Sequence, residues 1–210
     1  VLFGSPAELL LPAGAPTAAS EEVWAGLAAM NARWNAWKPG EVDDLNAALR
    51  NGRAHVVSPA LAVLLRDAAR LERASLGDFN PAIGALVAAW GFHDDVMRPG
   101  TRPRDEQIAR WTAAKPTLDS LRIDGLTLRS AQRSVQIDLG AYAKGAAIDW
   151  AFDRLARHGV RDGLLDLGGN LAARGRIEGR PWRIGIRDPH DGAGLAARLT
   201  LPGDAAVVTS

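Results

Sequence analysis

Apolar residues recur every three or four positions in three stretches of the chain, and this spacing predicts three amphipathic helices. The first begins at about residue 20, the second at Ser58 and Pro59, and the third near Gly140. Ser58 suits the N-cap and Pro59 the first helical position, while Gly77 and Gly159 are placed to end the second and third helices. The apolar stripes consist of Val23, Leu27, Met30 and Trp34, of Leu61, Leu64, Leu65, Ala68 and Leu71, and of Ile148, Ala151, Phe152 and Leu155.

Alternation with a period of two predicts strands in several shorter segments. Asp124 and Gly125 favour a tight turn between two of them, and a third run at 135–139 would extend this hairpin into an antiparallel meander. Asp105 is placed to cap one further short helix. Because helices and strands are intermixed without a strict βαβ rhythm, we expect an α+β fold with mixed or antiparallel sheets and packed helices. The predicted strands are 1–11, 121–123, 126–128, 135–139, 160–166, 182–187, 195–201 and 205–210.

The composition narrows the classes of function. A hydrophobic fraction of 47% in 210 residues is enough for one domain, or for two small lobes that share a core. Twenty-five basic residues against 24 acidic residues leave a net charge of +1, so we expect no nucleic-acid partner. The absence of cysteine excludes disulfides, thiolate metal sites and a cysteine nucleophile. No apolar run reaches the roughly 18 residues that a membrane span needs.

The segment 137–145 carries the most informative chemistry. A predicted strand ends at Asp138, Gly140 permits a tight turn, and a helix follows with Lys144 in its first turn. The free N–H groups of a helix N-terminus attract anions, typically phosphate, and a bound phosphate would offset the unfavourable position of the lysine. A divalent cation that bridges Asp138 to the phosphate would account for the carboxylate as well. The alternative is that Asp138 is only an N-cap and Lys144 a solvated surface residue.

Two further stretches are candidates for a binding site. Residues 164–170 form an apolar strand that ends in Gly168 and Gly169, which would let the backbone approach a ligand or another strand closely, or would simply form a tight turn. Residues 77–84 could place Phe79 and two polar groups against a ring system, or could be an irregular interhelical loop. Trp37 lies outside any helical stripe and is either a stacking platform or a core residue.

Other signals of chemistry are weak or missing. The four histidines, His55, His93, His158 and His190, are scattered without the spacing of metal ligands. The chain has no G-x-S-x-G nucleophile elbow, no P-loop and no G-x-G-x-x-G fingerprint. No catalytic residue can therefore be assigned from the sequence.

Taken together in order and spacing, these stretches resemble the FAD:protein FMN transferases of the ApbE family. The match runs nearly from end to end. The segments that carry it are Phe3-Gly4-Ser5, NAWKPGEVDDLN at 35–46, DFNPAIG at 78–84 with WGF at 90–92, DLGAYAKG at 138–145 with Asp149, LDLGGN at 165–170, WRIGI at 182–186 with Asp188-Pro189, and VTS at 208–210.

The resemblance implies an ApbE-like (T-fold-like) architecture and an enzyme that binds FAD and Mg²⁺. Such enzymes transfer the FMN half of FAD to a threonine hydroxyl on a target flavoprotein and release AMP. Carried over by position, the FAD-site residues would be Phe3, Trp37, Asp78, Phe79 and Asn80. Asp138 and Lys144 would hold the nucleotide, and the backbone carbonyl of Ala141 would ligate magnesium. Two positions depart from the family, which usually has Asp at position 80 and Tyr at position 37, and Asn80 cannot act as a charged metal ligand or as a base.

The resemblance also carries expectations about the whole protein. Residues 1–210 would be a single transferase domain truncated at its C-terminal end, because the family's last third, with the remaining magnesium ligands and a base for the threonine, has no counterpart here. The protein would be periplasmic or otherwise exported in a bacterium, with a possible lipid tether upstream of Val1. Its targets would resemble flavin-carrying subunits of membrane redox complexes. A metal-dependent FAD pyrophosphatase and a non-catalytic flavin carrier are the alternatives.

Overall fold

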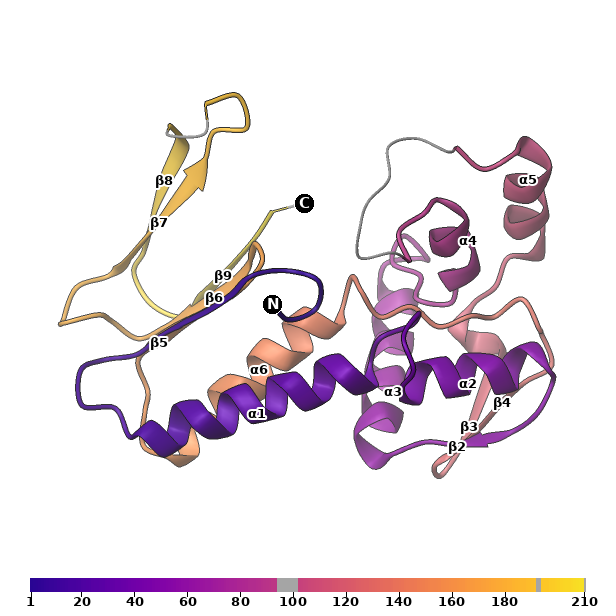
Figure 1. Cartoon of the computed structure of the whole chain (residues 1–210), viewed down its shortest axis with the longest axis horizontal. Coiled ribbons are helices and arrows are strands. Elements are labelled where there is room, and N and C mark those ends of the chain that lie inside the picture. Colours follow the sequence, from indigo (N-terminus) through magenta and orange to yellow (C-terminus); the bar gives the residue numbers. More distant parts are fainter. Residues whose placement is uncertain (94–101, 192–193, 210) are drawn as a thin grey trace. The chain divides into compact units, whose positions relative to one another are not determined.

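The computed structural model describes residues 1–93, 102–191 and 194–209. The chain forms two compact units (Figure 1), one made of Val1–Ala28 with Lys144–Ser210 and the other of Ala29–Ala143. Both units combine helices with antiparallel sheets, so the expected α+β class is confirmed. No helix within the described ranges is long and apolar enough to cross a bilayer.

The first unit is built on a four-stranded antiparallel sheet. Its strands, in spatial order, are β1 (Ala7–Leu10), β5 (Gly163–Leu167), β6 (Asn170–Arg174) and β9 (Ala205–Val208). Helices α1 (Thr17–Arg33) and α6 (Ala143–Arg157) run alongside one another (Figure 1). Gly26 permits this approach, since a Cβ there would lie 1.9 Å from the Trp150 ring.

A two-stranded hairpin follows the central strands of this unit. It consists of β7 (Trp182–Arg187) and β8 (Leu195–Leu201), both of which the alternation predicts. Trp182 is buried at the base of the hairpin, and its Nε1 donates a hydrogen bond to the Arg174 carbonyl at 3.0 Å. The small core around it comprises Leu164, Leu171, Ala173 and Leu201.

The second unit contains four helices and a three-stranded sheet in its described part. The helices are α2 (Glu41–Arg50), α3 (Pro59–Ala74), α4 (Gly84–Ala89) and α5 (Asp105–Ala114), and η1 (Leu118–Ser120) is a 3₁₀ turn. The strands are β2 (His55–Val56), β3 (Leu121–Asp124) and β4 (Thr127–Ser130), in the spatial order β2-β4-β3. The predicted hairpin turn at Asp124 and Gly125 is confirmed.

Helix α3 shows how local sequence sets the boundaries of a helix. The Ser58 hydroxyl accepts a hydrogen bond from Leu61 N at 3.2 Å with Pro59 next to it, which confirms the predicted N-terminus. The C-terminus differs from the prediction, because the helix ends at Ala74 and the left-handed position of its Schellman motif is Leu76, with φ of 56°. Gly77 N then donates to the Glu72 carbonyl at 2.9 Å.

Several elements are shorter than predicted or were missed. Strand β1 begins only at Ala7, because the preceding residues form a tight turn in which Leu2 and Ser5 exchange backbone hydrogen bonds of 2.8 and 3.0 Å. Helix α6 begins at Ala143 and not near Gly140. The sequence patterns did not predict α2, α4, β2 or β6, and Ser210 lies outside the described residues.

The predicted third strand of the meander at 135–139 is wrong as a sheet strand. Its alternate side chains Val135, Ile137 and Leu139 are buried as expected, but the backbone joins no sheet ladder. The segment is hydrogen-bonded instead to the buried side chain of Asn46 and to the loop at 81–84. Alternation shows that a segment is extended and buries every second side chain, but it does not show that the segment lies in a sheet. The hydrogen-bond partner of its backbone can be a side chain instead of a neighbouring strand.

Candidate functional site

A cavity of about 380 Å³ opens in the second unit. That volume lies within the range of small-molecule sites. Its lining is mainly apolar, and it includes six of the eight residues that the sequence singled out: Trp37, Asp78, Phe79, Asn80, Asp138 and Ala141. The two others, Phe3 and Lys144, belong to the first unit.

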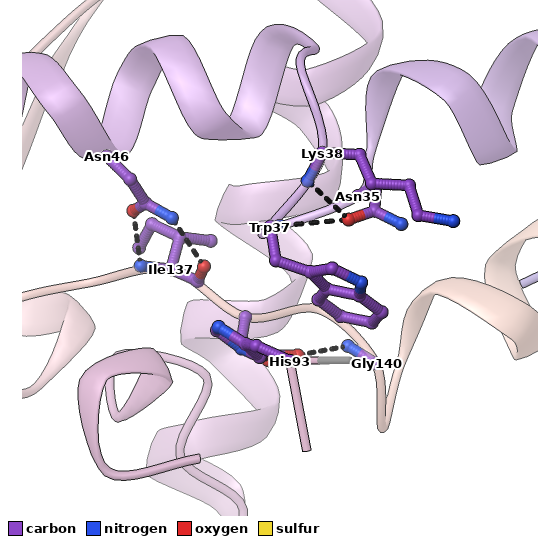
Figure 2. Close-up of polar contacts among 8 residues, drawn as sticks. Asn35, Trp37, Lys38, Asn46, His93, Ile137 and Gly140 are labelled. Carbon is purple, nitrogen blue, oxygen red and sulfur yellow. Dashed lines mark hydrogen bonds and ion pairs between the residues drawn. The ribbon is translucent and has the colours of Figure 1, made fainter. Parts of the chain in front are cut away.

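Trp37 is fixed at the cavity by the side chain that precedes it. The Asn35 Oδ1 accepts hydrogen bonds from the backbone N–H groups of Trp37 and Lys38, both at 2.9 Å (Figure 2). This turn sets the backbone of Trp37, and its indole stacks on the His93 imidazole with ring centroids 4.9 Å apart and planes inclined by 22°. The indole Nε1 is buried and has no hydrogen-bond partner among the described residues. The Trp37 ring is thus half-buried and stacks on a side chain of its own unit.

Asp138 uses both of its carboxylate oxygens within the second unit. Oδ1 accepts a hydrogen bond from Gly140 N at 2.8 Å, and Oδ2 lies 2.7 Å from His93 Nε2. The carboxylate thus closes a turn before α6 without being the N-cap of that helix, which begins only at Ala143, and it also contacts His93, whose ring stacks on Trp37 of the cavity wall. With its side chain only 11% exposed, the carboxylate is shielded from bulk water.

The backbone around Asp138 is held by a buried asparagine that sequence reasoning did not assign to the site. Asn46 Nδ2 donates to the Ile137 carbonyl at 2.8 Å, and its Oδ1 accepts from Ile137 N at 2.6 Å (Figure 2). Asp138 N donates to the Pro81 carbonyl at 2.8 Å. Asn46 is 3% exposed on an otherwise apolar face of α2, and that polar break in the stripe is the signal that could have revealed it.

Asn80 and its neighbours form a further part of the cavity wall. The Asn80 Nδ2 donates to the Pro116 carbonyl and its Oδ1 accepts from Ala82 N, both at 2.9 Å. The amide therefore fixes the loop, a task that a carboxylate could do only in part because it has no donor. The Phe79 ring packs in a tilted arrangement 6.1 Å from the Tyr142 ring, while Asp78 is exposed at the rim.

The first unit brings a second group of candidate residues together. Lys144 lies in the first turn of α6, and its Nζ is 3.4 Å from the Ser5 hydroxyl. Ser5 packs directly on Gly168, where a Cβ would lie 2.1 Å from the serine Cβ, and both Gly168 and Gly169 have positive φ. The double glycine therefore forms the tight turn between β5 and β6 and also permits a close approach of Ser5, so that both interpretations offered for it hold.

Phe3 adjoins this group through the N-terminal turn. It adopts φ of 51°, which is uncommon for a non-glycine residue, and it precedes Gly4, which is also left-handed at φ of 74°. The turn is closed by the reciprocal bonds between Leu2 and Ser5. Phe3 and Lys144 are thus both close in sequence or space to Ser5.

The described residues offer little for a metal ion by themselves. Across 1–93, 102–191 and 194–209, no three or more His, Asp or Glu side chains are grouped so that they could hold one. The oxygen donors among the cavity-lining residues include the carboxylates of Asp78 and Asp138, the Asn80 amide and the backbone at Ala141. His93 is the residue that sequence reasoning missed most completely, since scattered histidines carry no spacing signal and only its place directly after the WGF segment marks it.

Comparison with known proteins identifies the family. The model of the ApbE family matches residues 3–210. A FAD:protein FMN transferase of Rhodobacter capsulatus is 42% identical over 196 residues, which are 91% of this chain and 37% of that protein. One of Haemophilus influenzae is 32% identical over 175 residues, which are 80% of this chain and 50% of that protein. The chain thus spans half or less of the length of these relatives.

Solved structures agree with this family. The apo form of the Pseudomonas stutzeri flavinyl transferase ApbE has a TM-score of 0.79 at 28% identity, covering 96% of this chain and 63% of that one. The ApbE protein of Thermotoga maritima has a TM-score of 0.87 and covers all of this chain and 68% of that one, but at 21% identity it supports the fold alone. Because the family model matches residues 3–210 of its 210 residues, this chain belongs to the ApbE family.

Proposed function

We propose that this chain binds FAD and that the protein transfers its FMN half to a threonine hydroxyl of a target flavoprotein, releasing AMP. The observation that carries the proposal is the cavity in which Trp37 presents a ring face beside the shielded carboxylate of Asp138. A planar heteroaromatic ring needs such an apolar wall with a few polar groups at its edge. Asp78, Phe79 and Asn80 complete the wall.

The transfer is a phosphoryl substitution. The threonine oxygen forms a bond to the phosphorus of the FMN half, the bond from that phosphorus to the AMP oxygen breaks, and the hydroxyl proton passes to a base. Lys144 at the N-terminus of α6 is suited to hold the diphosphate, since its charge and the helix N–H groups both favour an anion. Phe3, in the neighbouring turn, would contact the same substrate.

Magnesium belongs to the proposal as well. Because the described carboxylates form no closed cage, Mg²⁺ would be held jointly by the Ala141 carbonyl, Asp138, the substrate diphosphate and water. When bound, the ion would neutralise negative charge that develops on the phosphates. The residues of this chain would orient the ring and the diphosphate.

We further propose the cellular location and the acceptor proteins that the family resemblance implies. The protein acts outside the cytoplasm of a bacterium, possessing a lipid tether upstream of Val1, and its acceptors are flavin-carrying subunits of membrane redox complexes. Fractionation of the native host followed by detection of the protein tests this location, and recovery from the cytoplasm would contradict it.

Equilibrium dialysis with FAD, with and without Mg²⁺, tests the binding step. We expect Trp37→Leu to weaken FAD binding about tenfold, since stacking of a base on an aromatic ring contributes about 1–3 kcal/mol. Trp111→Leu is the matched control, because this tryptophan lies on α5 and packs against Arg110 outside the cavity lining. Absence of FAD binding, or equal losses in both variants, would contradict the proposal.

The transfer step is tested on the complete gene product, because this chain spans half or less of its relatives' length. The protein is incubated with FAD, Mg²⁺ and a threonine-containing acceptor peptide, and the products are weighed by mass spectrometry. We expect AMP and a peptide that carries FMN. Release of FMN and AMP with an unmodified peptide would instead indicate an FAD pyrophosphatase, and unchanged bound FAD a flavin carrier.

A further inference from the structure

We propose that His93 is a built-in competitor for the ring-binding position on Trp37, so that FAD must displace the imidazole before its own ring can stack there. The inference rests on the proposed function, because it concerns the ring of Trp37, which lines the same cavity. It adds a residue that the sequence did not single out, and it predicts the direction in which the affinity for FAD changes when this residue is removed.

The first step concerns the ring face of Trp37. A centroid separation of 4.9 Å and an inclination of 22° are the geometry of an offset stack. Because the Asn35 side chain already fixes the Trp37 backbone, the platform does not depend on His93 for its position. The imidazole therefore occupies a face that is held ready by other residues, and a ligand ring cannot use the same face at the same time.

The second step concerns the edge of the imidazole. His93 Nε2 lies 2.7 Å from Asp138 Oδ2, and because a carboxylate only accepts, this nitrogen carries the proton in the contact. His93 thus presents a planar nitrogen heterocycle whose face lies on Trp37 and whose N–H points at Asp138. The adenine amino group and the N3–H of an isoalloxazine ring are likewise N–H donors at the edge of a planar heterocycle.

The third step concerns what remains when His93 leaves. Asp138 keeps its hydrogen bond from Gly140 N at 2.8 Å, so its orientation does not require the histidine. The Trp37 Nε1 is buried without a partner among the described residues, so the contact of the two rings leaves one donor unused. A ligand that carries acceptors can satisfy this donor, which His93 does not.

The competition has a measurable size. When a binding-competent state is populated only in a fraction of molecules, the apparent affinity falls by that fraction. The His93 and Asp138 side chains are only 17% and 11% exposed, so their contact is stronger than a surface pair. We expect that removing the imidazole tightens FAD binding by roughly three- to thirtyfold.

The experiment measures FAD affinity in the presence of Mg²⁺ for the wild type and for His93→Ala, with His55→Ala as control. His55 lies in β2 of the same unit and pairs with Leu128 of β4, whereas His93 is the histidine that stacks on Trp37. We expect tighter binding for His93→Ala, no change for His55→Ala, and an intermediate result for His93→Phe, which keeps the stack but loses the contact with Asp138. Unchanged or weaker binding by His93→Ala would overturn the inference, since it would make His93 a neutral residue or a support for Asp138.

A readout without ligand keeps this test separate from the proposed function. In the free protein, the ring current of Trp37 should shift the His93 ring protons upfield in NMR spectra, and Trp37→Leu should abolish that shift. A wild type and a His93→Ala variant that both fail to bind FAD would refute the proposed function, while unshifted His93 protons would overturn the inference alone. Binding by His93→Ala but not by the wild type would support both.

Discussion

Removal of the Asn46 side chain is the most direct test of how the site is built. Asn46→Ala leaves both the N–H and the carbonyl of Ile137 without their partners, which lie at 2.6 and 2.8 Å in the native protein. Each unsatisfied buried backbone group costs about 1–3 kcal/mol, so we expect a loss of about 2–6 kcal/mol in the free energy of unfolding. Since domains are stable by only about 5–15 kcal/mol, this is a large share of the total.

The assay is urea denaturation followed by circular dichroism, with FAD affinity as a second readout. Asn51→Ala is the matched control, because Asn51 follows the same helix and its Nδ2 donates to the Ala47 carbonyl at 2.8 Å on an exposed surface. We expect the control to change stability by less than about 0.5 kcal/mol. A loss below about 1 kcal/mol for Asn46→Ala, or equal losses for both variants, would refute the view that this side chain replaces a strand partner.

Three further predictions concern stability and can be checked by the same denaturation assay. Leu76→Gly should stabilise the protein by about 1 kcal/mol, because Leu76 is 94% exposed and left-handed at the end of α3, and a neutral or destabilising effect would contradict the cap assignment. Gly84→Ala should cost about 1–3 kcal/mol, because its Cβ would lie 2.8 Å from the Gln136 carbonyl, whereas Gly145→Ala, with open space in α6, should not destabilise. Burial raises the pKa of the Glu72 carboxyl above its ordinary value of 4.5, so the stabilisation that this group contributes is fully present below pH 4.5 and is lost as the pH rises through the raised pKa. Glu72→Gln should therefore be more stable than the wild type near pH 7 and should lose this advantage below pH 4.5. A difference in stability that does not change with pH would refute the argument.

Local rules predicted the elements whose boundaries are set within a few residues. The start of α3 follows from Ser58 and Pro59, and the turn between β3 and β4 from Asp124 and Gly125. The strands of the second hairpin, β7 and β8, follow from simple alternation. In each case the decisive hydrogen bonds join residues that are close in the sequence, and so the pattern of the sequence already contains them.

The parts that were missed depend on partners far away in the chain. Nothing near 135–139 shows that its backbone partner is an asparagine about 91 residues earlier. The role of His93 became visible only in the fold, which brings it against Trp37 and into contact with Asp138, a residue that lies 45 positions later in the chain. The local sequence and the resemblance to a family both supplied Trp37 and Asp138 as candidates, but they supplied neither the histidine that contacts both of them nor the reason why each side chain is held in place.

The segment at 135–139 explains why the walls of the cavity act as one structure. Asn46 attaches it to α2, the helix that follows the Trp37 turn, while Gln136 N and Asp138 N donate to the carbonyls of Ala82 and Pro81 at 3.1 and 2.8 Å. Asn80 anchors that same loop through both ends of its amide, so the departure from the family's aspartate gives the loop a donor that a carboxylate lacks. The segment 135–139 therefore joins the helix next to the aromatic wall, the loop and the carboxylate through hydrogen bonds, so these walls are in place before a ligand enters the cavity. His93, which covers the ring of Trp37, is then the group that has to move.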